Sequence, residues 1–237
     1  MTITKSISLI APRVIHAGIS PSSGDAVEVN AGTSGKVVLR TLSLNGANGG
    51  RNGVDYNSAS SLVVEDCGVA NFANHGIERL AKSPDLAQLT VSDTVLRGNG
   101  AREGEGGALI ARNAGSGSTD VDIDHSRAQL NLSGFEIGDG AKATITDSVA
   151  AGNGAGFVVF GNVQTARMFM ERDTATGNNI GIATLGGQAV VSNSTIVDNT
   201  TGLAADAPLI SRGNNTLTGN TSDGAFTGTL AAAYRSP

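Results

Sequence analysis

The chain has 237 residues, a formal net charge of −5, 3% aromatic residues and no tryptophan. This length can bury a sizeable core, but with so few aromatic rings the core must be narrow and built from Val, Ile, Leu, Ala and Ser. The scattered Lys and Arg residues exclude the basic stripe that a nucleic-acid partner requires, and no apolar run is long enough to span a bilayer.

The first predicted element is the alternating stretch TITKSISLI at residues 2–10, with no capping segment ahead of it. Open strand edges pair readily with another chain, so we predict that this N-terminal edge associates as an end-on homodimer. Further along, Cys67 is the only cysteine, which excludes an internal disulfide and predicts a small buried apolar side chain.

From residue 88 onward, short alternating strands recur, and each ends on a polar residue six positions before an asparagine. The strand LTVSD ends at Asp93, VDIDH at His125 and ATITD at Asp147. A glycine followed by a small or apolar residue comes shortly after each asparagine. The asparagines are Asn99, Asn131, Asn153, Asn178, Asn199 and Asn220. A phosphate-binding glycine loop occurs once in a chain, so this repetition indicates a repeating coil instead.

The repeat predicts an all-β fold, a right-handed parallel β-helix (solenoid) of about nine coils in a single domain over residues 1–237. No segment has the 3.6-residue period of a helix, and four- to six-residue strands alternate with Asn and Gly corners. We expect each asparagine to occupy a left-handed corner, because Asn tolerates that conformation. Stacked corners would then pair their amides as a ladder at the ~4.8 Å strand spacing.

Stacking also creates columns of equivalent residues, and one column is predicted to point inward. Five of its members are small, and the sixth is a carboxylic acid. If Asp173 points inward, burial raises its pKa and Ser148 and Ser194 become its hydrogen-bond partners. A slip of one residue would instead put it at the surface beside Arg172. The column is Cys67, Thr94, Ser126, Ser148, Asp173 and Ser194.

The strand at residues 119–125, TDVDIDH, carries an acidic row. Asp120, Asp122 and Asp124 lie on one face at roughly 6.6 Å intervals, pointing to solvent, while Val121 and Ile123 point inward. Such a row suits Ca²⁺, which prefers oxygen ligands, and also suits a merely solubilising face. Paired carboxylates such as Asp122 and Asp124 could cleave a glycosidic bond, with His125 and Asp173 as further catalytic candidates. No other cofactor is predicted.

Long insertions at residues 78–88, 98–107 and 112–118 predict a lateral ligand cleft, because insertions build clefts beside a regular rod. Charge also concentrates between residues 97 and 127. The candidate ligand-binding residues are Arg97, Arg102, Glu103, Glu105, Arg112 and Arg127. Variable loops that bind no ligand explain the same pattern.

The repeat resembles the pectin-lyase-like superfamily of right-handed β-helices, and within it bacterial β-helix repeat proteins. Ile123-Asp124-His125 is similar to the I-D-H tract of pectate lyases, although Asp122 precedes it and Ser126 follows it. Asn74-His75-Gly76 resembles the G-H-G tract of polygalacturonases without their paired aspartates, so we expect His75 to be a solvent-facing corner residue. Such relatives carry a leader and a cap, which implies that upstream residues are missing and that the chain is extracellular or on the cell surface.

Two functions stay open. One is a non-catalytic scaffold that binds glycan or protein along its side or ends. The other is a carbohydrate-active enzyme, a lyase or hydrolase acting on an acidic polysaccharide through strand 120–125 and neighbouring arginines. No complete catalytic tract is present, which favours the scaffold, and the fold alone hosts both classes.

Overall fold

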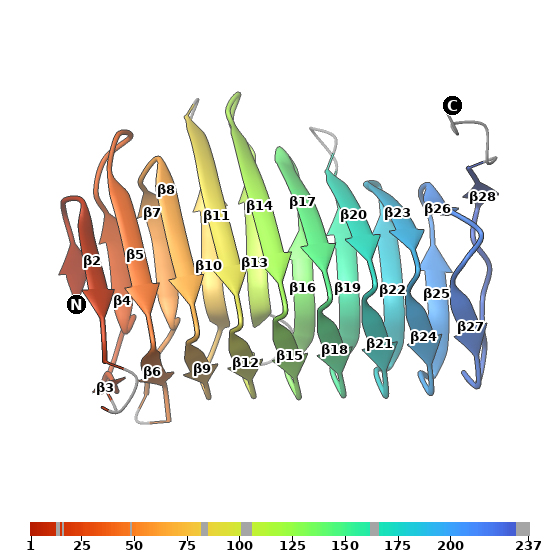
Figure 1. Cartoon of the computed structure of the whole chain (residues 1–237), viewed down its shortest axis with the longest axis horizontal. Coiled ribbons are helices and arrows are strands. Elements are labelled where there is room, and N and C mark those ends of the chain that lie inside the picture. The colour runs from red at the N-terminus through yellow and green to blue at the C-terminus, as the bar shows by residue number, and fades with distance from the viewer. Residues whose placement is uncertain are drawn as a thin grey trace.

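The computed structural model describes residues 1–12, 15, 17–47, 49–81, 85–100, 106–161 and 166–230. Within them the chain forms β-strands only, so the described part has no helix that could cross a membrane. All pairings between the named strands are parallel, and they make three sheets around one core (Figure 1). The chain is therefore a parallel β-helix, as predicted from the repeat.

Each coil contributes one strand to each sheet in turn. The first sheet contains β1 (Thr2–Ile3), β4 (Val27–Asn30), β7 (Val54–Ser58), β10 (His75–Ala81), β13 (Gly107–Asn113), β16 (Ser133–Ile137), β19 (Ala155–Phe160), β22 (Ile180–Leu185) and β25 (Thr201–Ala205). The second contains β2 (Ile7–Ile10), β5 (Lys36–Arg40), β8 (Ser61–Glu65), β11 (Leu86–Ser92), β14 (Ser118–Asp124), β17 (Ala141–Thr146), β20 (Arg167–Glu171), β23 (Gln188–Ser192), β26 (Leu209–Ser211) and β28 (Gly228–Thr229). The third contains β3 (Ala17–Ile19), β6 (Leu42–Asn45), β9 (Gly68–Ala70), β12 (Val95–Arg97), β15 (Arg127–Gln129), β18 (Val149–Ala151), β21 (Thr174–Thr176), β24 (Thr195–Val197) and β27 (Thr216–Thr218).

The coils stack along a rod with β1 and β28 at opposite ends (Figure 1). Nine strands in the first sheet place about eight full turns between its first and last rungs. The third sheet was not predicted. Its strands of three or four residues are the short segments between each strand end and the asparagine corner, and they are extended enough to pair with their neighbours.

The core follows from the alternation along each strand. On β14, Val121 and Ile123 are buried while Asp120 and Asp122 are exposed. Large rings are rare inside, and where two occur in successive coils, Phe135 and Phe157, they stack with centroids 5.6 Å apart. Cys67 is buried, as predicted.

The asparagine ladder is present. The backbone N–H and the side-chain Nδ2 of Asn131 both donate to Oδ1 of Asn153, each at 3.0 Å, and Nδ2 also donates to the Leu96 carbonyl at 3.1 Å. The same two bonds to the next asparagine recur at every rung. The donors are Asn99, Asn131, Asn153, Asn178 and Asn199, and Asn220 is the last acceptor of the ladder.

The expectation that these asparagines adopt the left-handed conformation is wrong. The residue before each one does so instead, because the amide must point inward to reach the backbone of the neighbouring coils. Gly98, Leu130, Gly152, Gly177, Asp198 and Gly219 hold this position, with φ between 55° and 72°. A second left-handed series lies at the strand ends, at Thr41, Asp66, Asp93, His125, Asp147, Arg172 and Asn193.

The inward column forms a second ladder. Each backbone N–H donates to the side chain of the next coil, as in Ser126 N–H to Ser148 Oγ at 3.1 Å and Ser148 N–H to Asp173 Oδ1 at 2.8 Å. Asp173 is 1% exposed and its own N–H donates to Ser194 Oγ at 3.1 Å. The surface alternative for Asp173 is therefore wrong, and Ser148 and Ser194 are its partners as expected.

Candidate functional site

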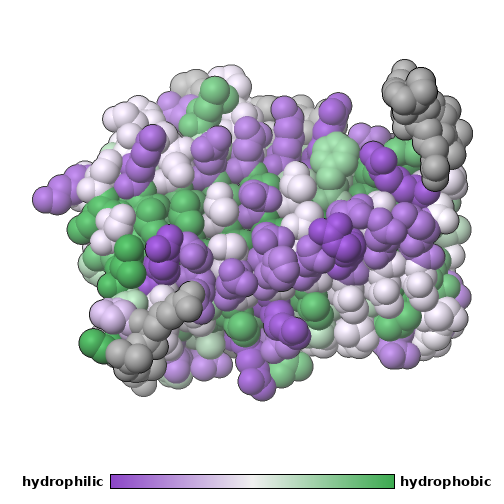
Figure 2. Space-filling model, viewed as in Figure 1, coloured by the Kyte–Doolittle hydropathy of each residue, from purple (hydrophilic) through white to green (hydrophobic). Residues whose placement is uncertain are grey.

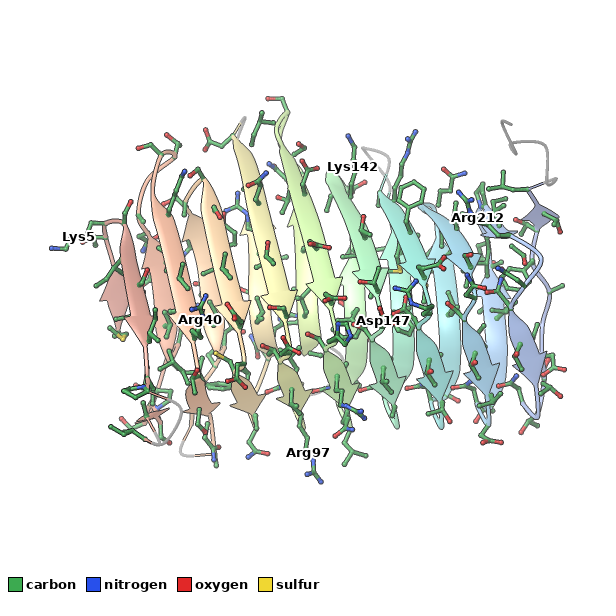
Figure 3. All side chains as sticks on the ribbon, in the orientation of Figure 1. Lys5, Arg40, Arg97, Lys142, Asp147 and Arg212 are labelled. Atoms are coloured by element: carbon green, nitrogen blue, oxygen red, sulfur yellow. The ribbon has the colours of Figure 1, made fainter. Side chains whose placement is uncertain are left out.

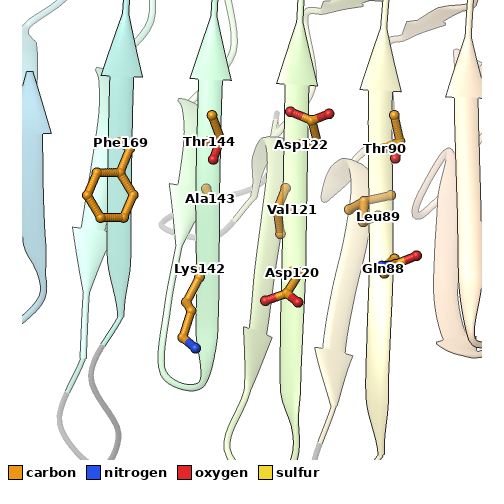
Figure 4. A pocket seen from close by; sticks show the side chains of 10 residues that line it. All are labelled: Gln88, Leu89, Thr90, Asp120, Val121, Asp122, Lys142, Ala143, Thr144 and Phe169. Atoms are coloured by element: carbon orange, nitrogen blue, oxygen red, sulfur yellow. The ribbon is translucent and has the colours of Figure 1, made fainter. Parts of the chain in front are cut away.

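The outer face of the second sheet holds a shallow pocket of about 590 Å³ that spans β11, β14, β17 and β20. Outward-pointing side chains line it in two rows that follow from the strand register (Figure 4). One row is Thr90, Asp122, Thr144 and Phe169, and the other begins with Gln88, Asp120 and Lys142. Neighbouring members of a row lie on adjacent strands, at a spacing of ~4.8 Å.

Phe169 is the aromatic residue on this face, and the sequence analysis did not predict it as a site residue. It is 44% exposed, although its neighbours Met168 and Met170 are buried. The signal was available, because alternation in the stretch MFMER puts the two methionines inside and the phenylalanine outside. A half-exposed ring beside hydroxyl and carboxylate groups combines an apolar platform with polar contacts, which is typical of ligand sites.

The predicted acidic row points to solvent, but its three carboxylates do not converge. Asp120 and Asp122 are exposed within the pocket, and Asp124 lies at the strand end. One group of potential metal ligands is found among the described residues. It consists of Asp124, His125 and Asp147, whose ligand atoms lie within 4.8 Å of one another. Asp120 and Asp122 do not belong to that group, because residues at i and i+2 on a strand lie roughly 6.6 Å apart along it.

The three residues of that group already have strong partners. Asp124 accepts hydrogen bonds from Thr146 at 2.6 Å and from the ring Nδ1–H of His125 at 2.7 Å, which hold its pKa below the usual value. The same contact with Asp124 raises the pKa of His125. Arg172 donates to both oxygens of Asp147, at 2.8 and 2.7 Å, and holds its pKa low. A cation would have to displace these bonds.

The group belongs to a polar band that crosses the near face of the rod (Figure 2). The band follows the ends of the second-sheet strands, where Arg40 bonds Glu65 at 2.7 Å and Arg172 bonds Asp147. Figure 3 shows Arg40 and Asp147 at this level, well above Arg97. The band consists of strand-end residues from successive coils that pair with one another.

The other charged candidates are spread over different faces. Arg97 and Arg127 are exposed on the third sheet, whereas Arg112 lies half-buried on the first. Arg102, Glu103 and Glu105 lie outside the described residues. The catalytic candidate Asp173 is enclosed in the core and has no surface for a substrate to reach. The described members of the charge cluster seen in the sequence therefore do not form one site.

The expectation that His75 is a solvent-facing corner residue is wrong. It is 7% exposed, and its Nδ1 lies 2.9 Å from Oε2 of Glu78. Both residues line a separate groove on the first sheet, together with Arg112 and Glu136. Sequence reasoning could not find this grouping, because its members come from three coils and from positions 61 residues apart.

Comparison with protein-family models, with curated proteins and with solved structures found no match to this chain. The parallel β-helix rests on the strand pairing itself, and the pectin-lyase-like superfamily stays a prediction.

Proposed function

We propose that the protein binds a polysaccharide along the outer face of the second sheet, without cleaving it there. The observation that carries the proposal is the row Thr90, Asp122, Thr144 and Phe169, which ends on an exposed aromatic ring in a pocket of about 590 Å³. The apolar face of a sugar ring can pack on Phe169, while its hydroxyl groups bond to the neighbouring side chains.

A linear glycan suits this face because the face is itself a linear repeat. Successive strands present one hydrogen-bonding side chain every ~4.8 Å, and a second row with Gln88, Asp120 and Lys142 runs parallel to the first. Asp120 and Lys142 are adjacent across the strands, so the polar groups carry both signs of charge. This mixture favours hydroxyl-rich ligands over a ligand of a single strong charge.

The second candidate is an acidic-polysaccharide lyase or hydrolase using strand 120–125, and there Asp124 is a poor proton donor. The bonds from Thr146 and His125 hold the pKa of Asp124 low, so Asp124 is ionised at neutral pH. Three carboxylates along one strand also repel a uronate chain.

The test is retention on a glycan array, followed by calorimetric titration with an oligosaccharide of the retained glycan. Burying a phenylalanine side chain is worth about 1.5–3 kcal/mol, so Phe169→Ala should weaken binding by about tenfold or more. Leu185→Ala is the matched control, because Leu185 is 48% exposed on the first sheet. Wild-type protein that retains no glycan, or equal affinity in Phe169→Ala, would refute the proposal.

A further inference from the structure

The two ends of the rod differ in how their outermost strands are covered. β1, β2 and β3 each lie at the edge of a sheet, and in the part of the chain that the structure describes no strand pairs with their outer sides (Figure 1). Such an edge presents a row of backbone N–H and C=O groups without strand partners. At the other end, the N–H groups of Gly202 and Leu203 on β25 donate to the carbonyls of Ser222 and Asp223, at 2.7 and 2.9 Å. There β28 also pairs with β26.

Inward side chains of the first coil are left uncovered in the same way. Ile7 and Leu9 on β2 are the register partners of Val37 and Leu39 on β5, so they point into the core. Val37 and Leu39 are at most 1% exposed, whereas Ile7 is 37% exposed and Leu9 is partly exposed. In the last coil, Leu209 on β26 is fully buried. The chain itself therefore closes the core at one end and leaves it open at the other.

Apolar side chains gather at the open end. The described part exposes twelve large hydrophobic side chains, and four of them lie within the first 15 residues, namely Met1, Ile7, Ile10 and Ile15. Apolar surface is visible at this end of the rod in Figure 2. The strand β2 has the sequence ISLI, without the charge or proline by which natural edge strands resist pairing. An apolar patch beside an open strand edge marks an interaction surface.

Size and symmetry indicate that the partner is a second copy of this chain. Thr2 and Glu28 are register partners, so the first coil spans 26 residues, and standard interfaces use about 20–30 residues on each side. A two-fold axis brings the same surface of both copies together, which requires a surface compatible with itself. β2 meets this requirement because it carries no charge that its own copy would oppose.

We propose that the protein forms a head-to-head homodimer in which β2 pairs antiparallel with β2 of the second copy. Directly opposed residues of antiparallel strands share one face, and Ile7 and Leu9 must face the core in both copies. At the centre of β2, this condition places Ser8 opposite Ser8 of the second copy and Ile7 opposite Leu9. The proposal gives a strand and a register to the end-on association expected from the sequence.

The asymmetry of the rod also sets the number of copies. A head-to-tail contact repeats without closing and produces filaments, whereas a two-fold contact uses the open end of each copy once. The opposite end has its core covered by the chain's own residues, as the burial of Leu203 and Leu209 shows. Association is therefore expected to stop at two copies.

The dimer has a consequence for the glycan face. Pairing of the two β2 strands joins the second sheets of both copies into one sheet, so their outer faces lie on the same side. The pocket beside Phe169 is then presented twice to one surface, which raises the apparent affinity for a polymer that reaches both. This consequence rests on the proposed function, whereas the dimer does not. A dimer that retains no glycan would refute the glycan proposal alone.

The test measures the mass of the full chain by sedimentation velocity from low to high micromolar concentration. We expect twice the 23.7 kDa of one chain, with dissociation on dilution. Ser8 is exposed and its side chain points away from the core, so Ser8→Lys should leave the fold of one copy unchanged. In the dimer the two new ammonium groups oppose each other, so the dimer should weaken by about tenfold or more.

A charge exchange tests the register. Ser8→Glu should weaken the dimer as Ser8→Lys does, and an equal mixture of the two variants should restore it, because opposite charges then meet at the axis. Thr229→Lys is the matched control, since Thr229 is exposed on β28 at the other end of the rod, and it should dimerise like wild type. Melting temperatures near the wild-type value show that each variant is folded.

Four outcomes overturn the proposal. They are a one-chain mass at every concentration, a mass that keeps growing beyond two copies, a wild-type dissociation constant in Ser8→Lys, and no recovery of the dimer in the mixture of charge variants.

Discussion

Replacing Asp173 by serine is expected to stabilise the protein at alkaline pH and to remove most of the change in its stability between pH 4 and pH 8. Asp173 is 1% exposed, and burial raises the pKa of its carboxyl from 3.8 to about 8. The backbone N–H groups of Ser148 and Glu171 donate to it at 2.8 and 3.1 Å and oppose the shift. Asp147 adds to the shift, and Arg172 works against it.

The size and direction of the effect follow from the proton balance. Between pH about 4 and about 8 the folded protein keeps a proton on Asp173 that the unfolded chain has released. The contribution to stability is therefore fully present below pH about 4 and is lost as the pH rises through about 8. A difference of about 4 pKa units corresponds to about 6 kcal/mol over the whole window.

Serine is the matched replacement because the neighbouring coils already use it. Ser148 Oγ accepts an N–H from the coil before and donates to the Thr146 carbonyl at 2.9 Å, and Ser194 Oγ donates to the Ser192 carbonyl at 2.8 Å. A serine at 173 can make the same bonds with no charge to bury.

The assay is urea unfolding at pH 5, 7 and 9. The variant should gain several kcal/mol over wild type at pH 9 and little at pH 5, while Asp122→Ser, on an exposed position, should leave the wild-type profile unchanged. If Asp173→Ser and wild type lose the same free energy of unfolding between pH 5 and pH 9, the buried carboxyl is not the cause.

Two further predictions concern the corners. Asn153→Ala removes the acceptor of the Asn131 backbone N–H and of one Nδ2 hydrogen in the core, and it should cost about 3 kcal/mol in urea unfolding. Asn220→Ala, at the half-buried end of the ladder, should cost about 1 kcal/mol, and equal losses would contradict the ladder argument. Leu130 is 58% exposed and left-handed with φ 55°, at a position where four of the other five coils use glycine. Leu130→Gly should therefore raise stability by about 1 kcal/mol, and a lower midpoint would show that the leucine side chain contributes to packing.

Local patterns determined the architecture. Alternation along each strand has a period of two residues whatever the chain does elsewhere, so it predicted which side chains of β14 face the core. The recurring asparagines and the inward column with Asp173 were also visible, because stacked coils give equivalent residues one environment. The pattern could not predict the backbone conformation of the corner. There the left-handed residue is the one before the asparagine.

The tertiary structure alone decided which surface residues meet. Spacings between ladder asparagines vary from 32 to 21 residues because the coils carry insertions of different length. The sequence distance between two charged residues therefore does not predict whether they lie on the same face. Arg97 and Arg112 are near in sequence but lie on different sheets, whereas Glu78 and Glu136 share one row at a separation of 58 residues. The physical reason is that each strand sets the direction of its own side chains. Which side chains become neighbours depends on the hydrogen-bond register between coils, and the sequence of one strand does not contain that register.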